Sequence, residues 1–136
     1  FIMTFGRDFA YIGNQYHLEI FGEELFPDLL FLNRELNCMV VVELKKGAFK
    51  PAYIGQLQTY MKVLDDKVRK PHENPTIGIL LCKSANKAFV EYVIRDYNHP
   101  MGVATYKTAE DMSEELRNAL PDMDEMRKLL TGDEHL

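Results

Sequence analysis

The chain has 136 residues, of which 46% are hydrophobic and 27% charged, and its formal net charge is −5. This length fits one domain with a substantial core, and the composition is that of a soluble globular protein. No apolar run approaches the roughly 18 residues of a membrane helix, and the N-terminus lacks the features of a signal peptide, so we expect a cytoplasmic protein with no membrane partner.

The negative charge is concentrated near the C-terminus. Residues 108–136 hold nine acids and three bases, a net charge of −6, whereas residues 1–107 hold 12 acids and 13 bases, a net charge of +1. Because the larger part of the chain is almost neutral, the acidic total does not exclude a nucleic-acid partner. We predict a folded domain over residues 1–107 and an acidic helical extension over residues 108–136.

The first half of the chain reads as three strands. Alternating apolar and polar residues predict a strand from Phe9 to Ile20, and the segment 21–27 (FGEELFP) is predicted to turn the chain. Strands follow at 28–32 and 38–45, joined by a polar turn. The last of these contains MVVVEL, which is apolar on both faces, as expected for a central strand covered on both sides.

The second half reads as alternating helices and strands. Pro51 fits the first turn of a helix of about four turns, in which apolar residues recur at three- and four-residue steps. Further elements are predicted at 76–82 (strand), 86–96 (helix), 101–107 (strand), 108–120 (helix) and 122–130 (short helix). The order β-β-β-α-β-α-β-α predicts an α/β fold, with a mixed central sheet flanked by helices.

Two acids and a lysine lie at the ends of two neighbouring predicted strands. Residues two apart share a face of a strand, so Glu43 and Lys45 point the same way. If strands 28–32 and 38–45 pair through their short turn, opposed positions sum to about 71, which places Asp28 near Glu43. A slip of one residue would turn the side chains to the opposite face.

Two carboxylates this close repel each other unless a cation joins them. Mg²⁺ binds one or two carboxylates, keeps several waters and takes its other ligands from a substrate phosphate. Such an ion activates a bound water, and Lys45 could hold that water or neutralise charge that develops on the phosphate. The alternative is that Asp28 only begins a strand and that Glu43 and Lys45 are solvated residues at a strand end.

These residues carry a resemblance to a known family. Pro27-Asp28 followed by Glu43-Leu44-Lys45 resembles the signature of the PD-(D/E)XK nuclease superfamily, which has the restriction-endonuclease-like fold. The predicted order is similar to the core of that fold, with the acid on the second strand of a meander and the ExK motif on the third.

Further segments extend the resemblance over nearly the whole chain to about Lys107. Gln56 and Tyr60, one helical turn apart in GQLQTY, resemble the Q-x-x-x-Y motif of the RecB-like branch. The segments DLLF, VVVELKKGAFKPAYIGQLQTYM, DDKVRKPHENPTIGILLCKS and GVATY are similar to the C-terminal nuclease domain of YhcG-type bacterial proteins.

The resemblance implies a role for each of these residues. Asp28 and Glu43 would be metal ligands, with the Leu44 carbonyl as a third, and Lys45 would be the catalytic lysine. Gln56 and Tyr60 would orient the substrate or this lysine. Many superfamily members add an acid from a helix before the meander, which this sequence lacks, and Glu19 is a candidate substitute.

We therefore predict an endonuclease domain that hydrolyses phosphodiester bonds in DNA, with Mg²⁺ as cofactor and Mn²⁺ as its substitute. DNA repair, recombination and restriction or defence are the processes that such a domain serves. The alternative is a non-cleaving nucleic-acid-binding or assembly module of a larger DNA-processing protein. Because fuller YhcG-type proteins carry an N-terminal helical domain, the resemblance implies such a partner domain upstream of Phe1, and a homodimer is also compatible with the sequence.

Overall fold

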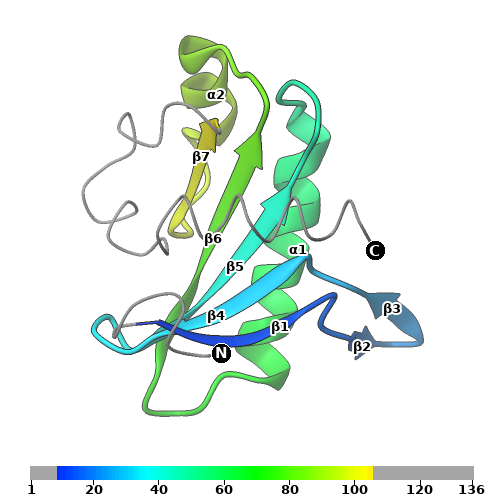
Figure 1. Cartoon of the computed structure of the whole chain (residues 1–136), viewed down its shortest axis with the longest axis vertical. Helices are drawn as coiled ribbons and strands as arrows, with labels where there is room; N and C mark the ends of the chain where they lie inside the picture. The colour runs from blue at the N-terminus through cyan, green and yellow to red at the C-terminus, as the bar shows by residue number, and fades with distance from the viewer. Residues whose placement is uncertain (1–8, 106–136) are drawn as a thin grey trace.

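The computed structural model describes residues 9–105 and centres on a five-stranded sheet with the strand order β1-β4-β5-β6-β7 (Figure 1). The strands are β1 (Phe9–Asn14), β4 (Leu29–Asn33), β5 (Cys38–Leu44), β6 (Asn74–Cys82) and β7 (Met101–Thr105). β1, β4 and β5 form an antiparallel meander, and β6 and β7 run parallel to β5. The predicted mixed α/β fold is therefore confirmed.

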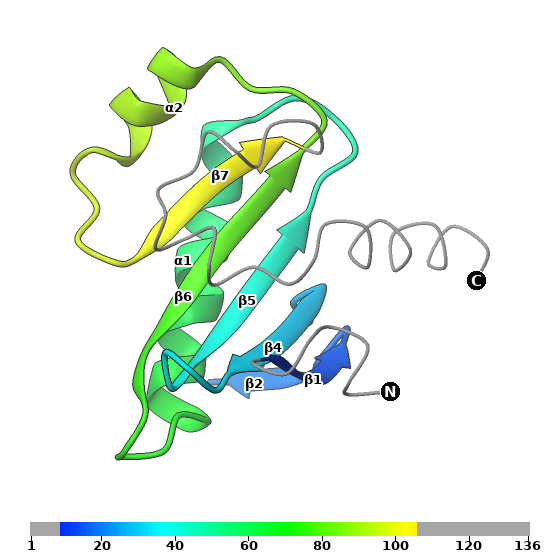
Figure 2. The same cartoon turned by 60° about the vertical axis from the view of Figure 1, so that its left-hand side comes forward.

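Two helices connect the parallel strands. α1 (Pro51–Lys67) joins β5 to β6 and lies along one face of the sheet (Figure 2). Its first residue is Pro51, whose missing N–H is not needed at that position. α2 (Lys87–Ile94) joins β6 to β7 and begins after Asn86, whose side chain accepts a hydrogen bond from the Phe89 N–H. Both helices contribute to the same apolar cluster.

β5 is buried over almost its whole length because both of its faces are covered. Val41 belongs to the apolar cluster that contains Leu57 of α1. Val40 belongs to the cluster on the opposite face, which also contains Phe31 of β4 and Ile79 of β6. The apolar pattern of this strand thus reflects its central place between β4 and β6.

The single strand predicted from Phe9 to Ile20 is wrong, because the chain turns at Gln15. This residue has a φ of +51°, which no regular strand accommodates. β1 ends before it, and the chain leaves the sheet as a separate hairpin of β2 (Leu18–Ile20) and β3 (Glu23–Leu25). The sheet resumes with β4, so the hairpin is an insertion between the first and second strands of the meander.

The tip of this hairpin is a two-residue turn. Phe21 and Gly22 have φ values of +50° and +83°, the left-handed pair that a type I′ turn requires. The Phe21 side chain is 97% exposed. The segment 21–27, predicted only to turn the chain, therefore contains strand β3.

Some of the predictions lie beyond residue 105. Cys38 and Cys82 are both buried. The helices predicted after residue 107 and the proposed domain boundary there lie outside the described residues. Among residues 9–105, no helix combines the length and apolar character needed to span a membrane.

Candidate active site

The register of β4 against β5 sets the position of the two acids. Leu29 lies opposite Val42 and Leu30 opposite Val41, so opposed residue numbers sum to 71. This is the register expected from the turn length. One step beyond the last pair, Asp28 faces Glu43.

Two hydrogen bonds join Asp28 to the end of β5. The Leu44 N–H donates to Asp28 Oδ2 at 2.9 Å, and the Asp28 N–H donates to Glu43 Oε1 at 3.2 Å. The N–H and C=O groups of a strand residue point to the same side. By this rule we expect the Leu44 carbonyl on the side of β5 on which Asp28 lies.

Glu43 is an acid in an unusually unfavourable setting for a negative charge. It is 2% exposed. Burial first, and then the adjacent Asp28 carboxylate, raise the pKa of Glu43 to about 9, although the Asp28 N–H and the charge of Lys45 act in the opposite direction. A carboxyl group with this pKa ionises at neutral pH only when a further positive charge lies beside it.

Lys45 is held by residues of α1. Its Nζ donates to Gln56 Oε1 at 2.8 Å and lies 4.6 Å from the centre of the Tyr53 ring. Gln56 Nε2 in turn donates to Tyr60 Oη at 3.0 Å. Three residues on successive turns of one helix therefore orient the lysine, because positions three and four apart share a helix face.

Tyr60 is the last residue of this hydrogen-bonded chain, and the charges of the two acids act on its hydroxyl. It is 6% exposed, and burial together with the charge of Glu43 raises the pKa of its hydroxyl. The hydroxyl therefore keeps its proton and accepts from Gln56. Of the two residues predicted to orient the lysine or the substrate, Gln56 contacts Lys45 and Tyr60 contacts Gln56.

Sequence reasoning missed Gln15, which contacts Asp28 twice. Its backbone N–H donates to the Asp28 carbonyl at 2.9 Å, and its Nε2 donates to Asp28 Oδ1 at 2.8 Å. With Leu44, Gln15 fixes both oxygens of the Asp28 carboxylate. The only sequence signal is the turn-favouring Gly13-Asn14 before it, which does not identify a role.

Glu19 lies apart from the two acids. It is exposed on β2 and pairs across the hairpin with Glu24. Within residues 9–105, no three His, Cys, Asp or Glu side chains form a group that could hold a metal ion. The carboxyl groups that the structure brings together at this strand end are those of Asp28 and Glu43.

Comparison with known proteins gives one family match and one curated relative. The family described as "YhcG PDDEXK nuclease domain" matches residues 1–121. The protein described as "Putative nuclease YhcG" from Escherichia coli (strain K12) is 33% identical over 107 residues, which are 79% of this chain and 28% of that protein. The matched region thus spans little more than a quarter of the relative's length.

Solved structures share the fold of this chain at low sequence identity. The "Structure of EndoMS-dsDNA2 complex" has a TM-score of 0.50 and 17% identity, and the match covers 71% of this chain and 36% of that one. The "crystal structure of a repair endonuclease from Pyrococcus abyssi" has a TM-score of 0.49 and 17% identity, with 73% and 39% covered. At this identity the likeness to EndoMS is one of fold, the restriction-endonuclease-like fold.

Proposed function

Because the chain belongs to the YhcG PDDEXK nuclease domain family, we propose that it is a metal-dependent endonuclease domain that hydrolyses phosphodiester bonds in DNA. The observation that carries the proposal is the placement of Asp28, Glu43 and Lys45 at one end of the β4–β5 pair. DNA is the proposed substrate because a structure of similar fold is a complex with double-stranded DNA.

The donor set fits a hard divalent cation, for which we propose Mg²⁺, with Mn²⁺ as a substitute. Asp28 and Glu43 supply carboxylate oxygens and Leu44 a carbonyl oxygen, which match the preference of Mg²⁺ for oxygen ligands and for few carboxylates. The raised pKa of Glu43 supports this proposal, because a cation beside the buried carboxyl group would favour its ionised form. When bound, the ion would polarise the phosphate and lower the pKa of a water.

The remaining side chains act through positioning and charge. The Lys45 ammonium, held by Gln56, lies on the same strand face as Glu43 and supplies positive charge for an attacking water or a developing phosphorane oxygen. Gln56 holds the ammonium and is itself held by Tyr60. Gln15 and the Leu44 N–H keep the Asp28 carboxylate in one orientation.

We propose further that residues 1–107 form this nuclease domain and that it works beside an N-terminal domain in a longer protein. The curated relative is much longer than the matched region, which supports this arrangement. DNA repair, recombination and restriction or defence are the candidate processes.

Cleavage of supercoiled plasmid DNA tests the proposal. We expect nicking with Mg²⁺ that chelator abolishes, and a Lys45→Ala rate lower by about 100-fold or more, since loss of a preorganised positive donor costs this much. Lys67→Ala is the matched control, because it removes an exposed lysine from the last turn of α1.

Two outcomes would refute the cleavage mechanism. Cleavage that continues in the presence of chelator would show that no metal ion is required. A Lys45→Ala variant as active as wild type would show that Lys45 has no role in cleavage. A protein that binds DNA but never cuts it would favour the non-cleaving module instead.

A further inference from the structure

Two loops at one end of the sheet are rich in lysine and contain no acid. Residues 45–50 (KKGAFK) follow β5, and residues 82–87 (CKSANK) end β6 and lead into α2. These 12 residues hold five lysines and no Asp or Glu, in a chain with 21 acids and 16 lysines and arginines. Because β5 and β6 are parallel, both loops leave the same edge of the sheet.

The two loops are joined by backbone hydrogen bonds beyond the ends of the strands. The Lys83 N–H donates to the Gly47 carbonyl at 2.9 Å, and the Phe49 N–H donates to the Ser84 carbonyl at 2.8 Å. Ala48 forms a parallel bridge with Ser84. The loops therefore form one connected backbone platform instead of two independent flexible segments.

Aromatic packing fixes this platform to α2. Phe49 is 8% exposed, and its ring meets that of Phe89 edge-on, with 6.1 Å between the ring centroids. Phe89 lies two residues after Lys87, and Val90 next to it is buried in the core. The start of α2 is thus held against the loop that follows β5.

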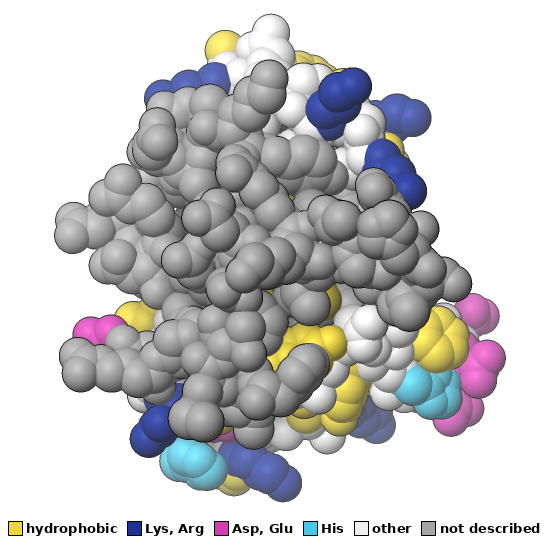
Figure 3. Space-filling model, in the orientation of Figure 1, with side chains coloured by type: hydrophobic (Ala, Val, Ile, Leu, Met, Phe, Trp, Pro, Cys, Tyr) yellow, Lys and Arg dark blue, Asp and Glu magenta, His cyan; other side chains and the backbone are white. Residues whose placement is uncertain are grey.

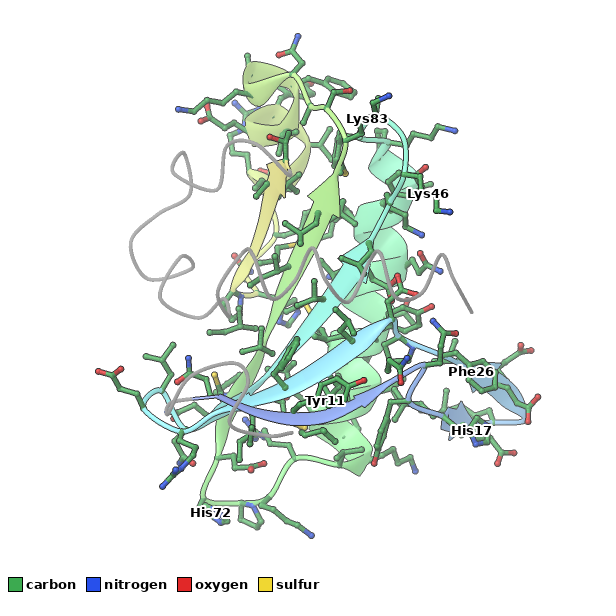
Figure 4. All side chains as sticks on the ribbon, in the orientation of Figure 1. Tyr11, His17, Phe26, Lys46, His72 and Lys83 are labelled. Atoms are coloured by element: carbon green, nitrogen blue, oxygen red, sulfur yellow. The ribbon has the colours of Figure 1, made fainter. Side chains whose placement is uncertain are left out.

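Four of the lysines are exposed on this platform, and together we call them the lysine edge: Lys46, Lys50, Lys83 and Lys87. Within residues 9–105, none of these four forms an ion pair with an acidic side chain. Lys46 and Lys83 project from the same end of the molecule, and His72 lies at the opposite end (Figure 4). In Figure 3, Lys and Arg side chains gather at the upper right, over this end.

The other flank of the candidate active site has the opposite charge. The β2–β3 hairpin leaves the sheet between Gln15 and Asp28, and its residues 18–25 hold three acids and no lysine or arginine. These acids lie together at the lower right of Figure 3. A phosphate backbone that approaches Asp28 and Lys45 is therefore attracted along one side and repelled along the other.

We propose that the DNA backbone leaves the active site over the lysine edge and turns away from the β2–β3 hairpin. This inference rests on the proposed function, because it takes DNA as the substrate. The lysine edge supplies sequence-independent phosphate contacts that set the orientation of the DNA, whereas Lys45 acts at the phosphate that is cleaved.

Fluorescence anisotropy with a labelled DNA duplex tests the proposal in EDTA, so that binding is measured without cleavage. The variant is Lys46→Gln/Lys83→Gln/Lys87→Gln. The matched control is Lys62→Gln/Lys67→Gln/Lys70→Gln, which removes three exposed charges from α1 and the turn after it. Affinity is measured between 50 and 200 mM salt, and thermal unfolding verifies that each variant is folded.

We expect the slope of log K against log salt to become shallower by about 0.9 per lost contact, or about 3 for the edge variant. The control keeps the wild-type slope. A wild-type slope in the edge variant, an equal loss in the control, or no salt-dependent binding by wild type would each overturn the proposal. Plasmid cleavage is measured separately. A variant that loses DNA binding is therefore distinguished from a variant that binds DNA but no longer cleaves it.

Discussion

Two neighbouring carboxyl groups, one of them almost fully buried, are a poor choice for stability alone. Glu43 is buried beside Asp28, and its raised pKa records the cost of ionising it there. Structural acids are far more often exposed or paired with a base. The pair is consistent with the proposed metal site, since perturbed carboxyl groups of this kind cluster at functional sites.

Gln15 is the residue whose removal we expect to disturb this pair most selectively. In Gln15→Asn the side chain is one methylene shorter and cannot reach Asp28 Oδ1, while Asn tolerates the left-handed backbone at this position. We expect the cleavage rate to fall about 10- to 100-fold, the usual cost of losing a group that orients a metal ligand. The Mg²⁺ concentration for half-maximal rate should rise in parallel.

Gln58→Asn provides the control for this experiment, since it makes the same change on α1 away from Asp28. Thermal unfolding of both variants measures any general loss of stability. A Gln15→Asn enzyme with the wild-type Mg²⁺ dependence would show that Gln15 does not position Asp28.

The contrast between Asp28 and Gln15 shows what sequence can reveal at this scale. The facing of Asp28 and Glu43 follows from a turn of four residues and from strand alternation, which can both be read from the sequence. The contact of Gln15 depends on a φ of +51° at a residue that is not glycine. No local pattern announces that conformation, so the residue could not be predicted.

At the scale of elements, the distance between α1 and the sheet depends on Gly78 of β6. A Cβ atom added there would lie 3.1 Å from Leu57 Cγ and would also meet Met61, both on α1. The absent side chain thus lets the helix approach the sheet closely. Because α1 carries Gln56 and Tyr60, this approach also sets where Lys45 is held.

We expect Gly78→Ala to destabilise the fold by about 1–3 kcal/mol, the typical cost of overpacking a dense core. Gly55→Ala is the matched control, because a Cβ at this helical position meets nothing within 4 Å. It should stabilise α1 by about 0.5–1 kcal/mol, since alanine is the better helix former. Urea unfolding measures both, and a Gly78→Ala protein as stable as wild type would contradict the packing argument.

The β2–β3 hairpin was the main element that sequence reasoning missed. Each strand has three residues, which is too short for alternation to be distinguished from chance. Two of its three cross-strand pairs contain an acid, Glu19 with Glu24 and Ile20 with Glu23. These pairs therefore do not show the matched apolar residues by which a hairpin is recognised. Only the tip, with Gly22, carried a recognisable turn signal.

At the scale of the whole molecule, the net charge of −5 conceals an uneven distribution of positive and negative charge. The lysine edge follows β5 and β6, whereas the β2–β3 hairpin precedes Asp28, and the two carry opposite charges. A chain of acidic composition can therefore present a basic path to a nucleic acid. The order of elements predicted the mixed sheet correctly, because the helices and strands of the second half have clear apolar periodicities. The distribution of surface charge could not be predicted in this way, because it depends on which loops the fold brings together.

The central claim is that Asp28 and Glu43 form a metal site, and calorimetric titration with Mn²⁺ tests it most directly. The account predicts that wild type and Lys45→Ala bind the ion, and that Asp28→Asn and Glu43→Gln each lose detectable binding, because each change removes one of the two carboxylates. Wild-type affinity in either acid variant would contradict the claim.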